Sequence, residues 1–192
     1  MLRLLAQIAL MDEYRYCLPD LHWHDYTLSA VGHGSNNATV NARKFIELRN
    51  GECNFFLMWD CHLETGTGNL VFGGSSQIGS KSDMVDSLLD ACLGPILIDM
   101  LPNFPGRKGA FFLTCSPFMN MMNSNCFNFI IAFCSGSVIP NNVALNLVKA
   151  FNMMAVYKHS VFAAVKIAFG SDIITLTHSP VGVVTRVEAT DF

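Results

Sequence analysis

The sequence is short of charge. Lysine, arginine, aspartate and glutamate together make up only 14% of the 192 residues, whereas apolar residues make up 51%. So large an apolar fraction argues against intrinsic disorder and predicts a single folded domain with a substantial core. It also predicts either a sheet buried on both faces or an apolar surface that meets a protein partner.

Three further features are missing. No basic run occurs and the net charge is −3, which argues against a nucleic-acid-binding protein. No apolar run is long and uninterrupted enough to span a bilayer. The seven cysteines include no Cys-X-X-Cys pair and their number is odd, which predicts a reducing, cytoplasmic environment more than a disulfide framework.

Patterns typical of metals and cofactors are also lacking. His22 and His24 are two positions apart and would share one face of a strand, but no fourth ligand is evident, so we expect no metal. Gly66-Thr67-Gly68 and Gly73-Gly74 lack the lysine and the following helix of a phosphate-binding loop. The sequence therefore predicts no cofactor.

Apolar runs alternate with helical patterns along residues 1–192. The strands predicted from these runs are 26–31, 55–59, 69–72, 110–114, 127–133 and 172–177. The predicted helices are 1–12, 84–100, 141–154 and 159–169, and residues 41–49 are predicted as a short helix or an extended segment. Within the helix 84–100, Pro95 is expected to cause a kink.

This alternation predicts an α/β fold of three layers, in which a mainly parallel β-sheet is flanked by helices. The strands 55–59 and 69–72 predict an antiparallel hairpin inserted near residues 52–74, a usual place for specificity or regulation. Residues 73–80 are predicted to be a flexible connector.

Two of the predicted strands end in residues that could act together chemically. The run 110–114 leads to Cys115, and the run 26–31 leads to Gly32-His33-Gly34. If these strands are adjacent and parallel, His33 and Cys115 lie at the same edge of the sheet, where open α/β sheets bind ligands. A thiol beside an imidazole is the minimum that nucleophilic cysteine chemistry needs.

A strand ending in Gly32-His33-Gly34, then a helix, then Leu113-Thr114-Cys115-Ser116 resembles the caspase-like cysteine peptidases. The similarity extends over roughly residues 26–180 and is greatest to CHAT domains and metacaspases, in particular divergent fungal CHAT-like proteins. It implies a caspase-like fold, here without its first strand and helix, and a peptide or protein substrate. It also implies that Cys115 is the nucleophile, that His33 is the general base, and that the backbone amides of Gly34 and Cys115 bind the oxyanion.

Two departures from the family leave other interpretations open. Cys115 is followed by Ser-Pro, and it follows His33 by 115 − 33 = 82 positions, against roughly 50 in caspases. The inserted hairpin could account for the additional residues between His33 and Cys115. The alternatives are a catalytically inactive caspase-like module that binds a protein partner through apolar surface, and a doubly wound domain with a small-molecule site.

Overall fold

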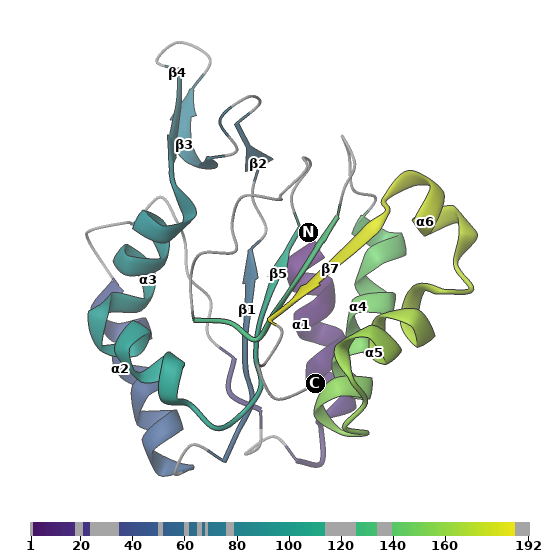
Figure 1. Ribbon diagram of the computed structural model, residues 1–192, viewed down its shortest axis with the longest axis horizontal. Coiled ribbons are helices and arrows are strands. Elements are labelled where there is room, and N and C mark those ends of the chain that lie inside the picture. Colours follow the sequence, from purple (N-terminus) through teal and green to yellow (C-terminus); the bar gives the residue numbers. More distant parts are fainter. Residues whose placement is uncertain are drawn as a thin grey trace.

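A mainly parallel sheet lies at the centre of the molecule (Figure 1). The computed structural model describes residues 2–17, 21–23, 35–49, 52–59, 62–64, 67, 69–75, 79–113, 126–133 and 140–186. Among these residues, the strands of the central sheet in spatial order are β1 (Phe55–Trp59), β5 (Lys108–Phe112), β6 (Phe129–Phe133) and β7 (Val181–Thr185). The first three are parallel, and β7 pairs antiparallel with β6 at the edge.

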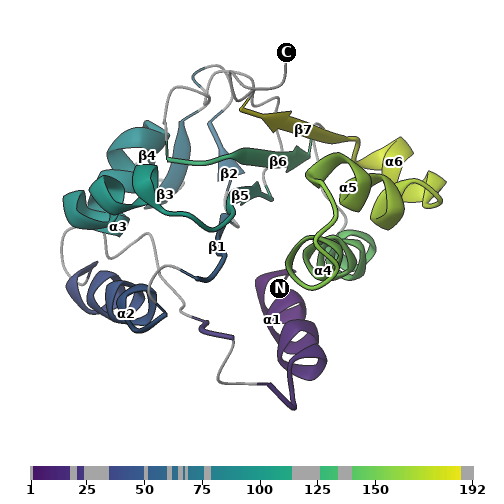
Figure 2. The same cartoon turned by 60° about the horizontal axis from the view of Figure 1, so that its bottom comes forward.

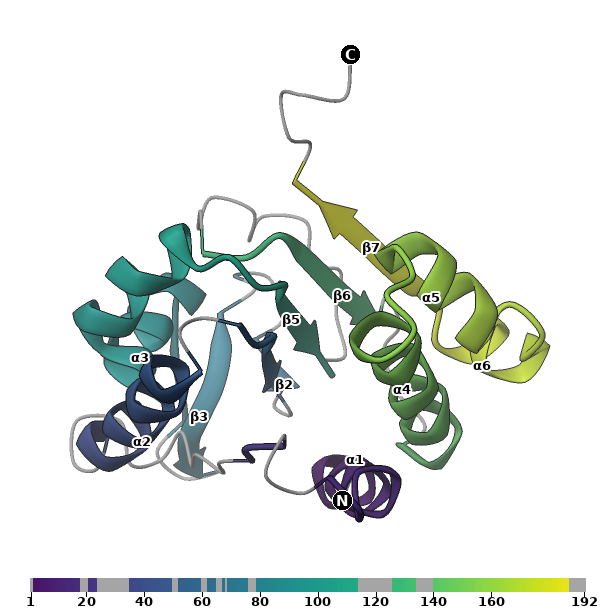
Figure 3. The ribbon, with the colours of Figure 1, turned by 90° about the horizontal axis from the view of Figure 1, so that it is seen from below.

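Helices cover both faces of this sheet, as Figure 3 shows from below. On one face lie α1 (Leu2–Glu13), α4 (Pro140–Ala155) and α5 (Val161–Phe169), and α6 (Ile173–His178) packs on α5. On the other face lies α3 (Val85–Met100), on which α2 (Ser35–Leu48) packs. The predicted three-layer α/β architecture is therefore confirmed.

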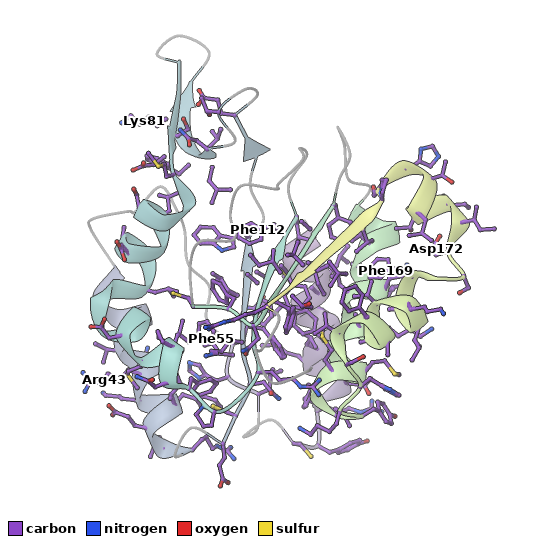
Figure 4. All side chains as sticks on the ribbon, viewed as in Figure 1. Arg43, Phe55, Lys81, Phe112, Phe169 and Asp172 are labelled. Carbon is purple, nitrogen blue, oxygen red and sulfur yellow. The ribbon has the colours of Figure 1, made fainter. Side chains whose placement is uncertain are left out.

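The strands supply side chains to two separate apolar cores because successive strand residues point to opposite faces. Phe111 belongs to the core beneath α4 and α5, which also contains Phe169. Phe112 belongs to the core against α3. Figure 4 labels Phe112 and Phe169 on the two sides of the sheet. Every residue of β5 and β6 is buried, so the prediction of a sheet buried on both faces holds for these strands.

The antiparallel insertion differs from the prediction. It consists of β2 (His62–Leu63), β3 (Leu70–Ser75) and β4 (Gly79–Asp83), with β3 between the other two. Residues 55–59 belong to the central sheet instead, because they pair in parallel with β5. The segment 73–80 is not a plain connector, since both of its ends are strand. The insertion rises from the end of the sheet toward which β1 points (Figure 1).

The kink predicted in the helix 84–100 is present in α3. Gly94 has φ 68° and ψ 157°, which is outside the helical region. Its neighbour Pro95 disfavours the helical conformation for the residue before it, and only glycine adopts this left-handed φ without strain. None of the described helices combines the length and apolar character that a membrane span needs.

The strand predicted at 172–177 is wrong. The helix α6 covers Ile173–His178 instead, and Asp172 caps its first turn: Oδ1 accepts from the Thr175 N–H at 2.9 Å, and Oδ2 accepts from Thr175 Oγ1 at 2.6 Å. The cap outweighs the strand preference of this β-branched run. The helix predicted at 159–169 is confirmed as α5, which begins after the N-cap Ser160 and ends before the C-cap Gly170.

Candidate functional site

The carboxyl ends of β1 and β5 lie side by side at one edge of the central sheet. Trp59, the last residue of β1, is the register partner of Phe112, the last residue of β5. The Leu113 N–H then donates to the Trp59 carbonyl oxygen at 2.8 Å, which extends the pairing by one residue. The two segments that follow therefore start from the same edge of the sheet, where open parallel sheets bind their ligands.

The residues predicted for the site lie outside the described residues. Cys115 follows Leu113 by two positions, and Gly34 is bonded to Ser35, the first residue of α2. His33, Gly34 and Cys115 thus remain predictions.

The neighbours of β5 bear on the predicted partnership of His33 with Cys115. The prediction assumed that a strand at 26–31 lies beside the strand that leads to Cys115. Residues 26–31 are outside the described part of the chain, but β5 is paired along one edge with β1 and along the other with β6. A strand has only two hydrogen-bonding edges, so residues 55–59 occupy the place beside β5 that the prediction gave to 26–31.

Sequence reasoning did not single out His62, which the sheet order brings into consideration. This histidine begins β2 and follows Trp59 by three positions, so it comes directly after the strand adjacent to β5. The interval to Cys115 is 115 − 62 = 53 positions, close to the interval of roughly 50 in caspases. That interval is readable from the sequence, but the place of His62 relative to the strand before Cys115 depends on the pairing of residues 55–59 with β5.

Hydrogen bonds hold the segment after His62 in place. The His62 backbone pairs with Val71 of β3. Glu64 accepts from Thr67 Oγ1 at 2.7 Å and from Ser82 Oγ at 2.9 Å, which joins the β2–β3 turn to β4. These two hydrogen bonds lower the pKa of the Glu64 carboxyl. The insertion, which lies at the end of the sheet toward which β1 points (Figure 1), thus fixes the backbone of His62.

The edge also holds a buried polar group without a partner. The Trp59 side chain is buried, and its Nε1–H finds no acceptor among the residues that the structure describes. Buried donors are usually satisfied, so this one is an exception in the core against α3.

Polar groups elsewhere in the described part of the chain form no second candidate site. Its histidines, cysteines and carboxylates nowhere gather in a group of three or more that could hold a metal ion. The ring of His22 stacks on Phe45 of α2, with centroids 4.9 Å apart. Cys17 is exposed, whereas burial raises the pKa of the half-buried Cys53 thiol.

Comparison with known proteins finds no matching family model, no matching curated protein and no matching solved structure. Function is therefore inferred from this chain's own residues and from its sheet order.

Proposed function

We propose that this chain is a caspase-like domain that hydrolyses peptide bonds, with Cys115 as the nucleophile and His62 as the general base. The observation that carries the proposal is the parallel pairing of β1 with β5. The chain passes from β1 to His62 in three positions and from Leu113 to Cys115 in two. The resemblance of the segment around Cys115 to CHAT domains and metacaspases supports the same class of reaction.

The proposed reaction needs only a thiol, an imidazole and water. The sulfur of Cys115 attacks the carbonyl carbon of the scissile peptide while His62 takes the thiol proton. The C–N bond then breaks, the imidazolium protonates the leaving amine, and Cys115 carries a thioester. Water, deprotonated by His62, attacks the thioester, which releases a carboxylic acid and restores the thiol.

The oxyanion of the tetrahedral intermediate needs fixed donors. The backbone N–H of Cys115 is one such donor in this proposal. Gly34 is a second donor only if His33 is the base, because Gly34 is predicted as a donor from its position directly after His33.

Peptide cleavage by purified variants tests the proposal. Against a peptide library, Cys115→Ala is expected to reduce cleavage to background. His62→Ala is expected to lower kcat/KM by about 10²- to 10⁴-fold, the usual contribution of a general base. His33→Ala is the matched control and is expected to change kcat/KM little. Unchanged cleavage by Cys115→Ala would contradict the proposed peptidase activity. A loss of kcat/KM in His33→Ala, with little change in His62→Ala, would make His33 the base.

A non-catalytic protein-interaction module is the second candidate. The observation that favours it is the exposure of large apolar side chains on α5 and α6, namely Phe162, Ile173 and Ile174. Contiguous exposed apolar surface often marks a protein-binding site. In this case the wild-type chain would cleave no member of the library although Cys115 is present.

A further inference from the structure

Strand β2 lies at one edge of the inserted sheet. Its residues His62 and Leu63 pair with Val71 and Leu70 of β3, and β4 lies on the far side of β3. No other strand in the described part of the chain pairs with β2. Figures 1 and 2 show β2 between β3 and the strands of the central sheet. The unpaired edge of β2 therefore lies on the side of the insertion that faces the central sheet.

The hydrogen bonds between β2 and β3 determine which backbone groups point to this edge. The Glu64 N–H donates to the Asn69 carbonyl oxygen at 2.8 Å, so Glu64 and Asn69 form a hydrogen-bonded pair. Hydrogen-bonded and non-hydrogen-bonded pairs alternate along an antiparallel ladder. Leu63 and Leu70 are therefore a non-hydrogen-bonded pair, and the N–H and C=O of Leu63 both point away from β3.

The position of Leu63 indicates what this edge binds. Unpaired strand edges bind extended peptides through main-chain hydrogen bonds. Leu63 directly follows His62, and a substrate has to lie beside its general base. The hydrogen bonds of Glu64 with Thr67 and Ser82 hold the next residue in place. The edge is thus ordered before a peptide binds, which lowers the entropic cost of binding.

We propose that an extended segment of the substrate peptide binds to the β2 edge, where its main chain accepts a hydrogen bond from the Leu63 N–H and donates one to the Leu63 carbonyl oxygen. This inference rests on the proposed peptidase activity with His62 as the base. The substrate is then an unfolded segment or an extended loop, because a helix uses its own N–H and C=O groups internally. Such main-chain contacts supply affinity without selecting a side chain.

Leu63→Pro tests the proposal because it removes the N–H that points to the edge. Proline is tolerated on an edge strand where the N–H lies outside the ladder, and circular dichroism checks that the variant keeps its fold. Against the peptide that the wild type cleaves best, kcat/KM is expected to fall about 2- to 10-fold, the effect of one hydrogen bond. Leu63→Val is the matched control, since it keeps the N–H and suits a strand, and it is expected to cleave like the wild type.

Thioamide substitution of the same peptide, at one carbonyl after another apart from the scissile one, identifies the partner of Leu63. Sulfur is a weak acceptor. One position is therefore expected to lower kcat/KM in the wild type and in Leu63→Val, with no further loss in Leu63→Pro, because both changes remove the same hydrogen bond.

The outcomes separate this inference from the proposed function. Cleavage by Leu63→Pro at the wild-type rate would overturn the role of the β2 edge, and so would equal losses in Leu63→Pro and Leu63→Val. A wild type that is insensitive to every thioamide would overturn it without any variant. A wild type that cleaves no peptide would contradict the proposed function itself, and this inference with it.

Discussion

The indole ring of Trp59 stacks on the phenyl ring of Phe112, with centroids 6.1 Å apart and planes 5° from parallel. The two residues end adjacent parallel strands, so their contact joins β1 to β5 at the edge from which the chain continues to His62 and Cys115. Aromatic pairs of this kind stabilise a protein beyond the area that they bury.

Trp59→Phe is expected to cost far less stability than Trp59→Ala. The phenylalanine variant keeps an aromatic ring on Phe112 and removes an N–H that has no acceptor in the described part of the chain, so we expect a loss of less than about 1.5 kcal/mol. The alanine variant opens a cavity and is expected to lose about 3–5 kcal/mol. Urea unfolding measures both. Equal losses would mean that the indole N–H contributes a hydrogen bond.

Gly109→Ala is expected to destabilise the central sheet. A methyl group at Gly109 of β5 would overlap the ring of Phe129, its register partner in β6. Overpacking of this kind costs about 1–3 kcal/mol. Gly73→Ala in β3 is the matched control, because the nearest atom to its added methyl group is at 3.9 Å, an ordinary contact. Thermal unfolding should therefore show a clear loss for Gly109→Ala and little change for the control.

Arg107→Lys is expected to loosen the connection between β5 and the end of α4. The Arg107 guanidinium donates to the carbonyl oxygens of Met154 at 2.9 Å, His159 at 2.6 Å and Lys158 at 3.0 Å. Lysine cannot reproduce this planar fork, and we expect a loss of about 1–3 kcal/mol in the free energy of unfolding.

The control for Arg107→Lys is Arg43→Lys. Arg43 forms an exposed ion pair with Glu47 at 2.6 Å, and exposed pairs contribute only about 0–1 kcal/mol. Denaturant titration of both variants makes the comparison, and equal losses would contradict a special role for Arg107.

Asp172 is expected to make stability depend on acid pH. Hydrogen bonds from the Thr175 side chain, the Thr175 backbone and the Asn146 side chain lower the pKa of Asp172 below its ordinary value of 3.8. A carboxyl with a lowered folded-state pKa stabilises the fold above its unfolded-state pKa, and this contribution disappears as the pH falls through the folded-state value. Asp172→Asn should remove that part of the pH dependence in thermal unfolding between neutral and acid pH. An unchanged acid slope would contradict the role of the carboxylate.

Local sequence patterns predicted the strands that are buried on both faces. The runs 110–114 and 127–133 match β5 and β6 to within two residues at either end, because a short apolar run between turn signals has few other stable conformations. The strand prediction for 172–177 was wrong for a local reason. The Asp172 side chain caps a helix there, although β-branched residues do not favour helices.

Strand pairing was harder to predict than strand position. Residues 55–59 were correctly predicted as a strand, but their partner β5 lies about fifty positions further along the chain. A run of residues does not specify which distant strand it pairs with, and the hairpin with 69–72 was the nearer choice. The proposed role of His62 depends on the same pairing of β1 with β5.

Alkylation of the cysteines by iodoacetamide, followed residue by residue with mass spectrometry, tests the proposed pair most directly. Only the thiolate reacts, so a thiol beside a base should react at least about tenfold faster than the exposed reference Cys17. We predict fast alkylation of Cys115 in the wild type and in His33→Ala, and a rate near that of Cys17 in His62→Ala. A Cys115 that reacts no faster than Cys17 in the wild type, or one that keeps its rate in His62→Ala, would contradict the pairing of Cys115 with His62.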